Sequence, residues 1–159
     1  MKIALTGHRP GRLYTNDLLS PEWNKLRERL RYILLSEKCT DAYTGMADGS
    51  DIVFALAVCD LKNTNHHINL HCILPCNEYQ CNHPFYYTIK NHANEWKSLS
   101  THFYKGCDNI RDQYLVDHSD KLIAVWDGNK SGGVWGTICK ARKQNLPIIY
   151  VDVAANQGA

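Results

Sequence analysis

The chain has 159 residues, of which 44% are hydrophobic and 21% are charged, a composition typical of one globular domain that folds without disulfides. Eighteen basic and sixteen acidic residues give a net charge of +2, which argues against a protein that binds nucleic acid through a concentrated basic surface. No stretch is apolar enough to cross a membrane and no secretion signal is visible, so we expect no membrane contact. The seven scattered cysteines are odd in number and favour reduced thiols in a cytoplasmic protein.

The first half of the chain alternates short apolar runs with helical segments. Strands are predicted over residues 2–5, 41–43 and 68–74, and helices over residues 21–38 and 51–61. The first helix carries its apolar residues on one side. The second is apolar almost throughout, so we expect it to be packed on more than one side.

An irregular polar segment over residues 76–85 opens the second half of the chain. After it the sequence predicts, in order, a helix over 86–97, a short edge strand over 102–104, a helix over 108–118, a strand over 121–126, a helix over 135–144 and a strand over 147–151. The repeated strand–helix–strand order predicts a single doubly wound, Rossmann-like α/β domain with a mainly parallel sheet over residues 1–159.

Three glycine-containing segments, over 6–10, 44–51 and 131–137, lie at predicted strand ends or helix starts, where open parallel sheets bind ligands. Glycine lets the backbone approach a ligand closely, and the amides at a helix start attract phosphate or carboxylate. Such turns also occur in proteins that bind nothing, but three at corresponding positions predict a ligand site. The residues expected to bind the ligand are Gly7, His8, Arg9, Gly45, Met46, Asp48, Gly49, Ser50, Arg111, Asp127, Ser131, Gly132, Gly133, Gly136 and Thr137.

Several of these side chains also have purely structural explanations. Arg9 and Arg111 can grip a phosphate with two nitrogens, or they can form salt bridges between elements. His8 can contact a ribose or phosphate, or it can cap its loop. Asp127 can bind the ligand or form a turn.

Three motifs in a fixed order cover nearly the whole chain. They are Thr-Gly-His-Arg-Pro at 6–10, Gly-Met-Ala-x-Gly-x-Asp at 45–51, and the run from Arg-Asp-Gln-Tyr to Val-Trp-Asp-Gly at 111–128 that precedes a Gly-Gly pair. Together they resemble the YpsA-like branch of the SLOG superfamily, which also contains the LOG-type phosphoribohydrolases and the DNA-processing protein DprA. The resemblance implies a Rossmann-like fold and a nucleotide-type ligand. Some members cleave N-glycosidic bonds, and others are thought to sense NAD- or nucleotide-derived signals, such as ADP-ribose, in bacterial and phage conflict.

The LOG-type enzymes resembled here use an arginine and a glutamate for catalysis. Arg111 stands where that arginine would be, and the glycine pair with Gly136 and Thr137 fits the loop before the glutamate. Lys140 stands where the glutamate would be, and a lysine cannot act as the catalytic carboxylate. We therefore expect a protein that binds or senses a nucleotide-derived signal. The alternative is an N-glycosidic hydrolase with Arg111 and with Asp48, or another aspartate, as catalytic residues.

Cys72, Cys76 and Cys81 lie close in sequence to His71 and His83, which raises the question of a metal site. The spacing does not form a zinc knuckle, and strand alternation places His71 and Cys72 on opposite faces, so we expect neither a metal nor another cofactor.

The expected partners are a nucleotide-derived small molecule and further copies of the chain. Related hydrolases pair through helices, so the resemblance implies a homo-oligomer. Aromatic residues in segment 76–87 could form a subunit interface or a lid. DprA-like nucleic-acid binding is a third alternative, against which the near-neutral charge argues.

Overall fold

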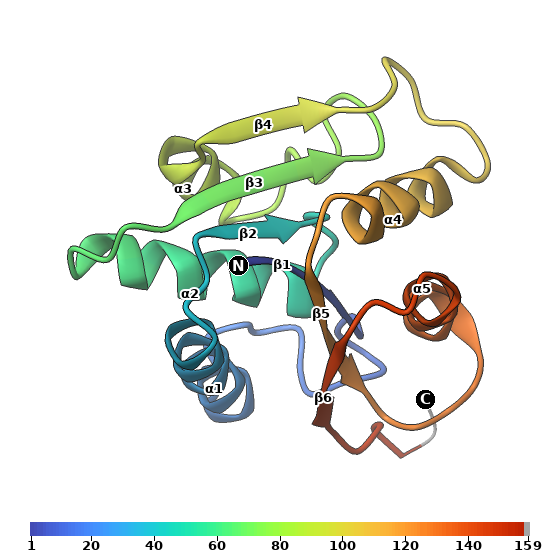
Figure 1. Cartoon of the computed structure of the whole chain (residues 1–159), viewed down its shortest axis with the longest axis horizontal. Helices are drawn as coiled ribbons and strands as arrows, with labels where there is room; N and C mark the ends of the chain where they lie inside the picture. Colours follow the sequence, from blue (N-terminus) through green and yellow to red (C-terminus); the bar gives the residue numbers. More distant parts are fainter. Residues whose placement is uncertain (158–159) are drawn as a thin grey trace.

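Six parallel strands form the central sheet of the computed structural model, which describes residues 1–157. Their order is β4-β3-β2-β1-β5-β6, so the chain builds outward from β1 to β4 and then returns to the other side of β1 (Figure 1). The reversal between β1 and β5 is the switch point at which such folds bind ligands. The predicted single, doubly wound α/β domain is confirmed, while the last two residues of the predicted range 1–159 lie outside the described residues.

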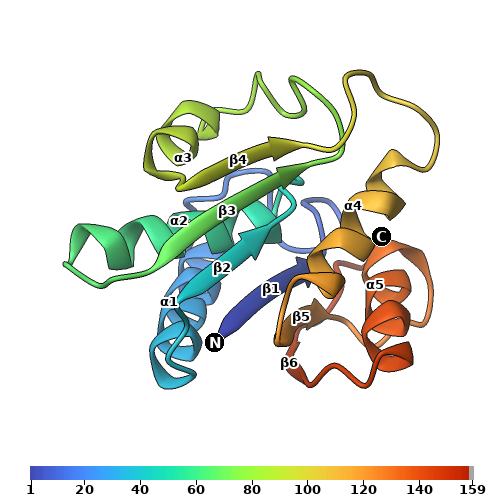
Figure 2. The ribbon, with the colours of Figure 1, turned by 45° about the horizontal axis from the view of Figure 1, so that its top comes forward.

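The strands are β1 (Lys2–Gly7), β2 (Asp41–Thr44), β3 (Asn69–Leu74), β4 (Glu95–Ser98), β5 (Lys121–Trp126) and β6 (Ile148–Asp152). The helices are α1 (Pro21–Ser36), α2 (Ser50–Asn63), α3 (Tyr86–His92), α4 (Cys107–Asp117) and α5 (Gly132–Lys143). The carboxyl ends of the strands point toward one edge of the sheet, where α4 begins (Figure 2). None of the helices within residues 1–157 is long and apolar enough to cross a membrane.

Helices cover both faces of the sheet. On one face α2 packs against the side of β1 that carries Ile3 and Leu5, with α1 and α3 packed against α2, and on the other face α4 and α5 pack against the side of β1 that carries Ala4 (Figure 1). This split follows from the alternation of side chains along a strand. As predicted from its apolar sequence, α2 is buried on nearly every side, because it lies between the sheet and its neighbouring helices.

The prediction for residues 86–97 is wrong in its second half. Helix α3 ends at His92, and the following residues form the edge strand β4, in which Trp96 pairs with Cys72 of β3. Asn94 fixes the turn between them, since its backbone amide donates to Leu70 O at 2.8 Å and its side chain accepts from Leu70 N at 2.9 Å. Strand pairing therefore overrides the local helical pattern. The edge strand predicted at 102–104 is a loop instead.

Helix α5 begins earlier than the predicted residue 135. It starts at Gly132, inside the third glycine segment, so this segment is the first turn of a helix rather than a loop that precedes one. The consequence is that the amides of the segment point along the helix axis toward the carboxyl edge of the sheet.

Candidate functional site

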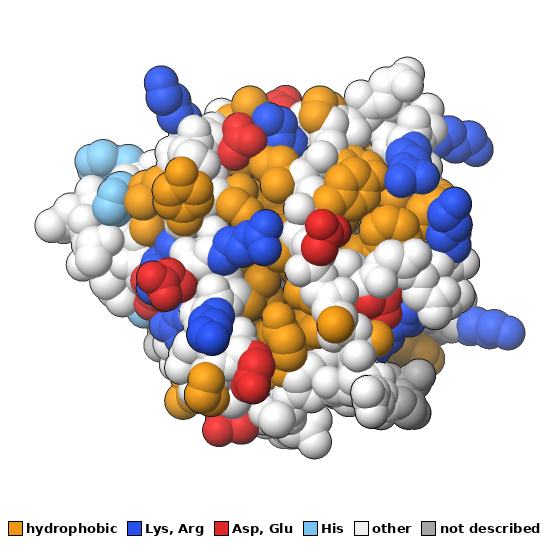
Figure 3. Space-filling view, turned by 90° about the horizontal axis from the view of Figure 1, so that it is seen from below, with side chains coloured by type: hydrophobic (Ala, Val, Ile, Leu, Met, Phe, Trp, Pro, Cys, Tyr) orange, Lys and Arg blue, Asp and Glu red, His pale blue; other side chains and the backbone are white. Residues whose placement is uncertain are grey.

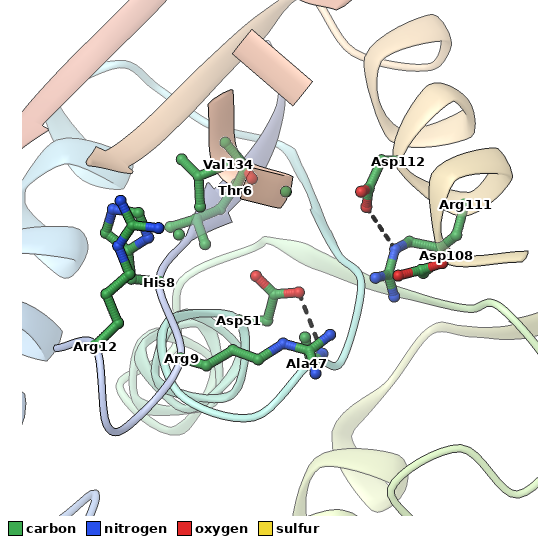
Figure 4. Close-up of a pocket in the computed structure, with 13 residues that line it drawn as sticks. Thr6, His8, Arg9, Arg12, Ala47, Asp51, Asp108, Arg111, Asp112 and Val134 are labelled. Carbon is green, nitrogen blue, oxygen red and sulfur yellow. Dashed lines mark hydrogen bonds and ion pairs between the residues drawn. The ribbon is translucent and has the colours of Figure 1, made fainter. Parts of the chain in front are cut away.

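A cavity of about 240 Å³ lies at the switch point between β1 and β5. Its walls come from the end of β1 and the loop after it, from the segment that leads into α2, and from the first turns of α4 and α5 (Figure 4). The lining residues are Leu5, Thr6, Gly7, His8, Arg9, Arg12, Ala47, Asp51, Asp108, Arg111, Asp112, Gly133 and Val134.

The end of β1 is pressed against the start of α2. A Cβ atom on Gly7 would lie 2.4 Å from Cβ of Ser50, so only glycine fits at this position. The Ser50 hydroxyl donates to His8 O at 2.7 Å, which ties the two segments together. Gly49 has a φ of +88°, and its Cβ would lie 2.7 Å from Cδ of Pro10. These residues shape the cavity wall without offering free polar groups to it.

Arg111 reaches the cavity from α4 and is only 3% exposed. Its Nη1 donates to Gly45 O, and its Nε donates to Asp112 Oδ1 at 2.7 Å. A Cβ on Gly45 would lie 2.8 Å from the guanidinium, so the glycine makes room for the arginine. Burial opposes the charge, but Asp112 and Asp51 raise the pKa of Arg111 above its ordinary value. Arg111 is therefore a fixed cation in the wall.

Asp51 lies in the first turn of α2 and is 6% exposed. Its Oδ2 accepts a hydrogen bond from the amide of Ala47 at 3.2 Å. Burial raises the pKa of Asp51 to about 6, with a further upward effect from Asp112 and an opposing effect from Arg111. A buried carboxyl with a pKa near neutrality, in a cavity beside a specific charge, is typical of a functional site.

On the opposite side, His8 and Arg12 line the cavity and are paired with Asp127, which lies behind the wall. Arg12 donates to both carboxylate oxygens of Asp127, at 2.8 and 3.1 Å, and His8 Nε2 accepts from the Asp127 amide at 3.1 Å. Burial lowers the pKa of His8, so the ring is neutral at pH 7. Burial alone would raise the pKa of Asp127, but bonds from Arg12 and the Asn129 amide lower it to about 2. This cluster joins the β1 loop to the end of β5.

Helix α5 presents its N-terminus to the cavity through Gly133 and Val134. Ser131 precedes the helix but makes no side-chain capping bond, and the first turn carries no acidic residue. The first amides of a helix lack partners within it and attract anions. The start of α5 can therefore bind a phosphate or carboxylate.

Arg9 supplies a cation that is not held in an ion pair in the described part of the chain, although its charge acts on Asp51 and favours the ionised form of that carboxyl. Within residues 1–157 it forms no ion pair, and its Nη2 donates to the hydroxyl of Tyr79 at 3.2 Å. Figure 4 shows side chains converging from the β1 loop, α2 and α4, among them Arg9, Asp51 and Arg111. The cavity thus combines one uncompensated cation, one helix N-terminus and several carboxylates.

A comparison with protein-family models matches residues 3–154 to the YspA SLOG family. The chain belongs to the YspA SLOG family. The match covers nearly the whole chain and confirms the resemblance that the sequence motifs predicted. A search of curated proteins gives no match.

Five of the residues predicted to bind a ligand in this SLOG protein line the cavity: Gly7, His8, Arg9, Arg111 and Gly133. The others lie behind the wall or outside the cavity, and they are Gly45, Met46, Asp48, Gly49, Ser50, Asp127, Ser131, Gly132, Gly136 and Thr137. Thr137 is among them because its hydroxyl donates to Gly133 O at 3.1 Å, within α5. Lys140 and Gly136 border a separate hollow between α4 and α5.

Asp48, the predicted catalytic carboxylate, does not reach the cavity. Its Oδ1 accepts from His83 Nε2 at 2.8 Å and from the Gly49 amide at 2.9 Å. The carboxylate that does line the cavity is Asp51, one turn further along the same motif. The sequence indicated several aspartates near strand ends but not which of them faces inward.

The remaining lining residues were missing from the predicted set: Leu5, Thr6, Arg12, Ala47, Asp51, Asp108, Asp112 and Val134. A signal existed for Asp108 and Asp112, which are spaced four apart in a predicted helix that also carries Arg111, so the three lie on neighbouring faces. No local pattern reveals Arg12, because its partner Asp127 is 115 residues away.

Within the described part of the chain no group of three or more histidine, cysteine or acidic residues is arranged to hold a metal ion. Cys72 lies in the core, whereas His71 lies on the other face of β3 between Asp41 and Glu95, at 2.8 Å from each carboxylate. The predicted separation of His71 and Cys72 onto opposite faces is confirmed.

Proposed function

We propose that this SLOG protein senses or sequesters a nucleotide or nucleotide-derived signalling molecule, and that the cavity holds its phosphorylated sugar. The observation that carries the proposal is that Arg9 and the N-terminus of α5 both line one cavity, at the switch point of the sheet. Membership of a SLOG family supports nucleotide-related binding or glycosidase-like chemistry.

The anionic end of the ligand would lie between Arg9 and the first turn of α5. Arg9 has no carboxylate partner within residues 1–157, so a phosphate would not have to displace an existing ion pair. The amides at Gly133 and Val134 would supply hydrogen bonds, and the helix dipole favours negative charge there.

The sugar would lie against the carboxylates of Asp51, Asp108 and Asp112, which line the same cavity. Carboxylate oxygens accept hydrogen bonds from ribose hydroxyls, as they do in other Rossmann-like sites. The volume of about 240 Å³ lies just below the range of roughly 300–1,000 Å³ that is typical of small-molecule sites. A sugar phosphate fits this space, whereas ADP-ribose or NAD would extend out of it.

The test is calorimetric titration of the protein with ribose 5-phosphate, AMP and ADP-ribose. We expect binding that weakens at least tenfold in Arg9→Ala, because the variant removes the uncompensated cation. Arg29→Ala is the matched control, since Arg29 is exposed on α1 and does not line the cavity. Absence of binding by all three compounds would contradict the proposal.

A second candidate function is hydrolysis of an N-glycosidic bond, and the burial of Asp51 with its pKa of about 6 favours it. In this reaction the bond between the base and the sugar breaks, a carboxylate takes a proton from the attacking water, and the leaving base gains a proton. Asp51 rather than Asp48 would act as the base, because Asp48 does not line the cavity.

Release of free base from a nucleoside monophosphate or an NAD-type compound tests this second function. We expect Asp51→Asn to abolish any release and Asp48→Asn to retain it. Binding of an intact ligand without release would favour a sensor over an enzyme.

We also propose that the protein is a cytoplasmic homo-oligomer that pairs through α1. The face seen from below carries hydrophobic side chains among charged ones (Figure 3), and on α1 Tyr32 and Leu35 are 72% and 46% exposed. In segment 76–87, the other expected interface, Tyr86 is buried and Tyr87 is 67% exposed. Sedimentation velocity should report an assembly that Tyr32→Ser with Leu35→Ser dissociates, and a wild-type monomer would contradict this.

A further inference from the structure

One aromatic side chain lies between the two arginines of the cavity. The hydroxyl of Tyr79 accepts a hydrogen bond from Arg9 Nη2 at 3.2 Å, and its ring centroid lies 5.7 Å from the guanidinium carbon of Arg111. We propose that Tyr79 is a positioning residue that fixes both arginines for an anionic ligand. The ligand part of this inference rests on the proposed function, while the effect on the arginines does not.

The two arginines depend on Tyr79 to different degrees. Arg111 is buried and is also held by Gly45 O and Asp112. Arg9 is exposed, and the bond to Tyr79 is the one side-chain hydrogen bond that it makes within residues 1–157. A long side chain without partners samples many rotamers, and ordering it on ligand binding costs free energy. Tyr79 therefore matters most for Arg9.

The backbone on both sides of Tyr79 adopts an unfavourable conformation. Glu78 has a φ of 59° and Gln80 a φ of 60°, and neither is glycine. Residues with side chains rarely adopt this left-handed region, and such conformations cluster at functional sites. The segment is also anchored, because Asn77 N donates to Ser100 O at 3.1 Å. The backbone thus keeps Tyr79 in one position although the residues on both sides of it adopt unfavourable φ values.

A second anchor comes from Asp48. His83 Nδ1 accepts the Phe85 amide at 3.2 Å, so its Nε2 carries the hydrogen and donates to Asp48 Oδ1 at 2.8 Å. This bond ties the segment that contains Tyr79 to the second glycine loop. Asp48 thereby contributes to the site from outside the cavity, by holding the segment that holds Arg9.

The first arm of the test needs no ligand. Nuclear spin relaxation of the arginine Nε–H groups is measured in the wild type, Tyr79→Phe and Tyr79→Leu. We expect Tyr79→Phe, which keeps the ring, to mobilise Arg9 and to leave Arg111 unchanged, whereas Tyr79→Leu mobilises both. If Tyr79 had a merely structural role, the variants would change the relaxation of groups throughout the protein, and Tyr79→Phe would not affect Arg9 differently from Arg111.

The matched control for this arm is Tyr150→Phe. The Tyr150 hydroxyl accepts from Arg142 Nη2 at 3.0 Å and from Arg142 Nε at 3.3 Å, away from the cavity, so the variant removes a comparable contact between a tyrosine hydroxyl and an arginine. It should mobilise Arg142 and leave Arg9 unchanged. If Arg9 relaxes in Tyr79→Phe as it does in the wild type, the inference is overturned.

The second arm is calorimetric titration with ribose 5-phosphate. Tyr79→Phe should weaken binding about tenfold, and in an Arg9→Ala background it should cause no further loss. Additive losses would overturn the inference, since Tyr79 would then act independently of Arg9. If the wild type does not bind ribose 5-phosphate, the proposed function fails, and the relaxation data still decide whether Tyr79 positions the arginines.

Discussion

Two aspartates near the carboxyl edge of the sheet are both shielded from solvent, but their carboxylates accept different numbers of hydrogen bonds. Asp127 accepts two bonds from Arg12 and one from the Asn129 amide, and its pKa falls to about 2. Asp51 accepts one bond, from the Ala47 amide, and its pKa rises to about 6. A fully paired carboxylate holds segments of the fold together, whereas an underpaired one keeps hydrogen-bonding capacity for a ligand.

The largest effect is expected at the paired aspartate. Asp127→Ala should lower the free energy of unfolding by about 3 kcal/mol at pH 7, because it removes the acceptor of Arg12 and leaves only the backbone amide of residue 127, bonded to His8, to link the β1 loop to the end of β5. Urea denaturation followed by circular dichroism measures the change. Asp152→Ala, at the exposed end of β6, is the control. If the free energy of unfolding fell by less than about 1 kcal/mol, Asp127 would not hold the fold together more strongly than Asp51.

The underpaired aspartate should behave in the opposite way. Because the folded-state pKa of about 6 lies above the ordinary 3.8, protonated Asp51 favours folding below pH 3.8, and this contribution disappears as the pH rises through 6. Asp51→Asn should therefore raise the free energy of unfolding by about 1–2 kcal/mol at pH 8 and have little effect near pH 4. Denaturation at several pH values checks this, and destabilisation by Asp51→Asn at pH 8 would contradict it.

An effect of similar size, but destabilising, is expected at the glycine that accommodates Arg111. Gly45→Ala places a Cβ 2.8 Å from the guanidinium, so Arg111 must move, at a cost of about 1–2 kcal/mol in folding. Gly136→Ala is the control, because nothing lies within 4 Å of its added Cβ. Thermal unfolding and titration with ribose 5-phosphate should both separate the two variants. Equal behaviour would mean that Arg111 has room to relax.

The smallest effect is expected at Asp48, whose side chain is 41% exposed. Asp48→Ala should cost only about 0.5–1 kcal/mol in unfolding, as expected for a hydrogen bond near solvent. It should weaken ligand binding less than Tyr79→Phe does, because it acts on Arg9 only through His83 and the segment that follows Tyr79. If Asp48→Ala weakened ligand binding more than Tyr79→Phe, Asp48 would matter more for the site than Tyr79, contrary to the inference.

The sequence was sufficient to predict the sheet class, the order of most elements and the region of the site, because hydrophobic periodicity and glycine segments are local signals. It was not sufficient to predict what the glycines do in the fold. Gly7 and Gly45 were expected to let the backbone approach a ligand, but they make room for Ser50 and Arg111. Those partners lie far along the chain, so only the folded structure brings them together.

The same limit explains the missed residues and the wrong edge strand. Arg12 gains its place from Asp127, and Tyr79 gains its place from two arginines that precede and follow it by many residues. β4 forms at 95–98 because β3 offers it an open edge, and the local pattern gave no sign of that. Local sequence indicates where side chains can point, and long-range contacts decide which of them meet.

The indole rings of Trp126 and Trp135 are nearly parallel, at 13°, with centroids 5.5 Å apart. Trp126 is the last residue of β5, and Trp135 lies in the first turn of α5, the helix whose N-terminus lines the cavity. Electronic transitions of two indoles at this separation couple, so the near-ultraviolet circular dichroism of the pair depends on the angle between the rings. The protein therefore contains a built-in optical reporter, which responds to any shift of α5 against β5 without an added dye.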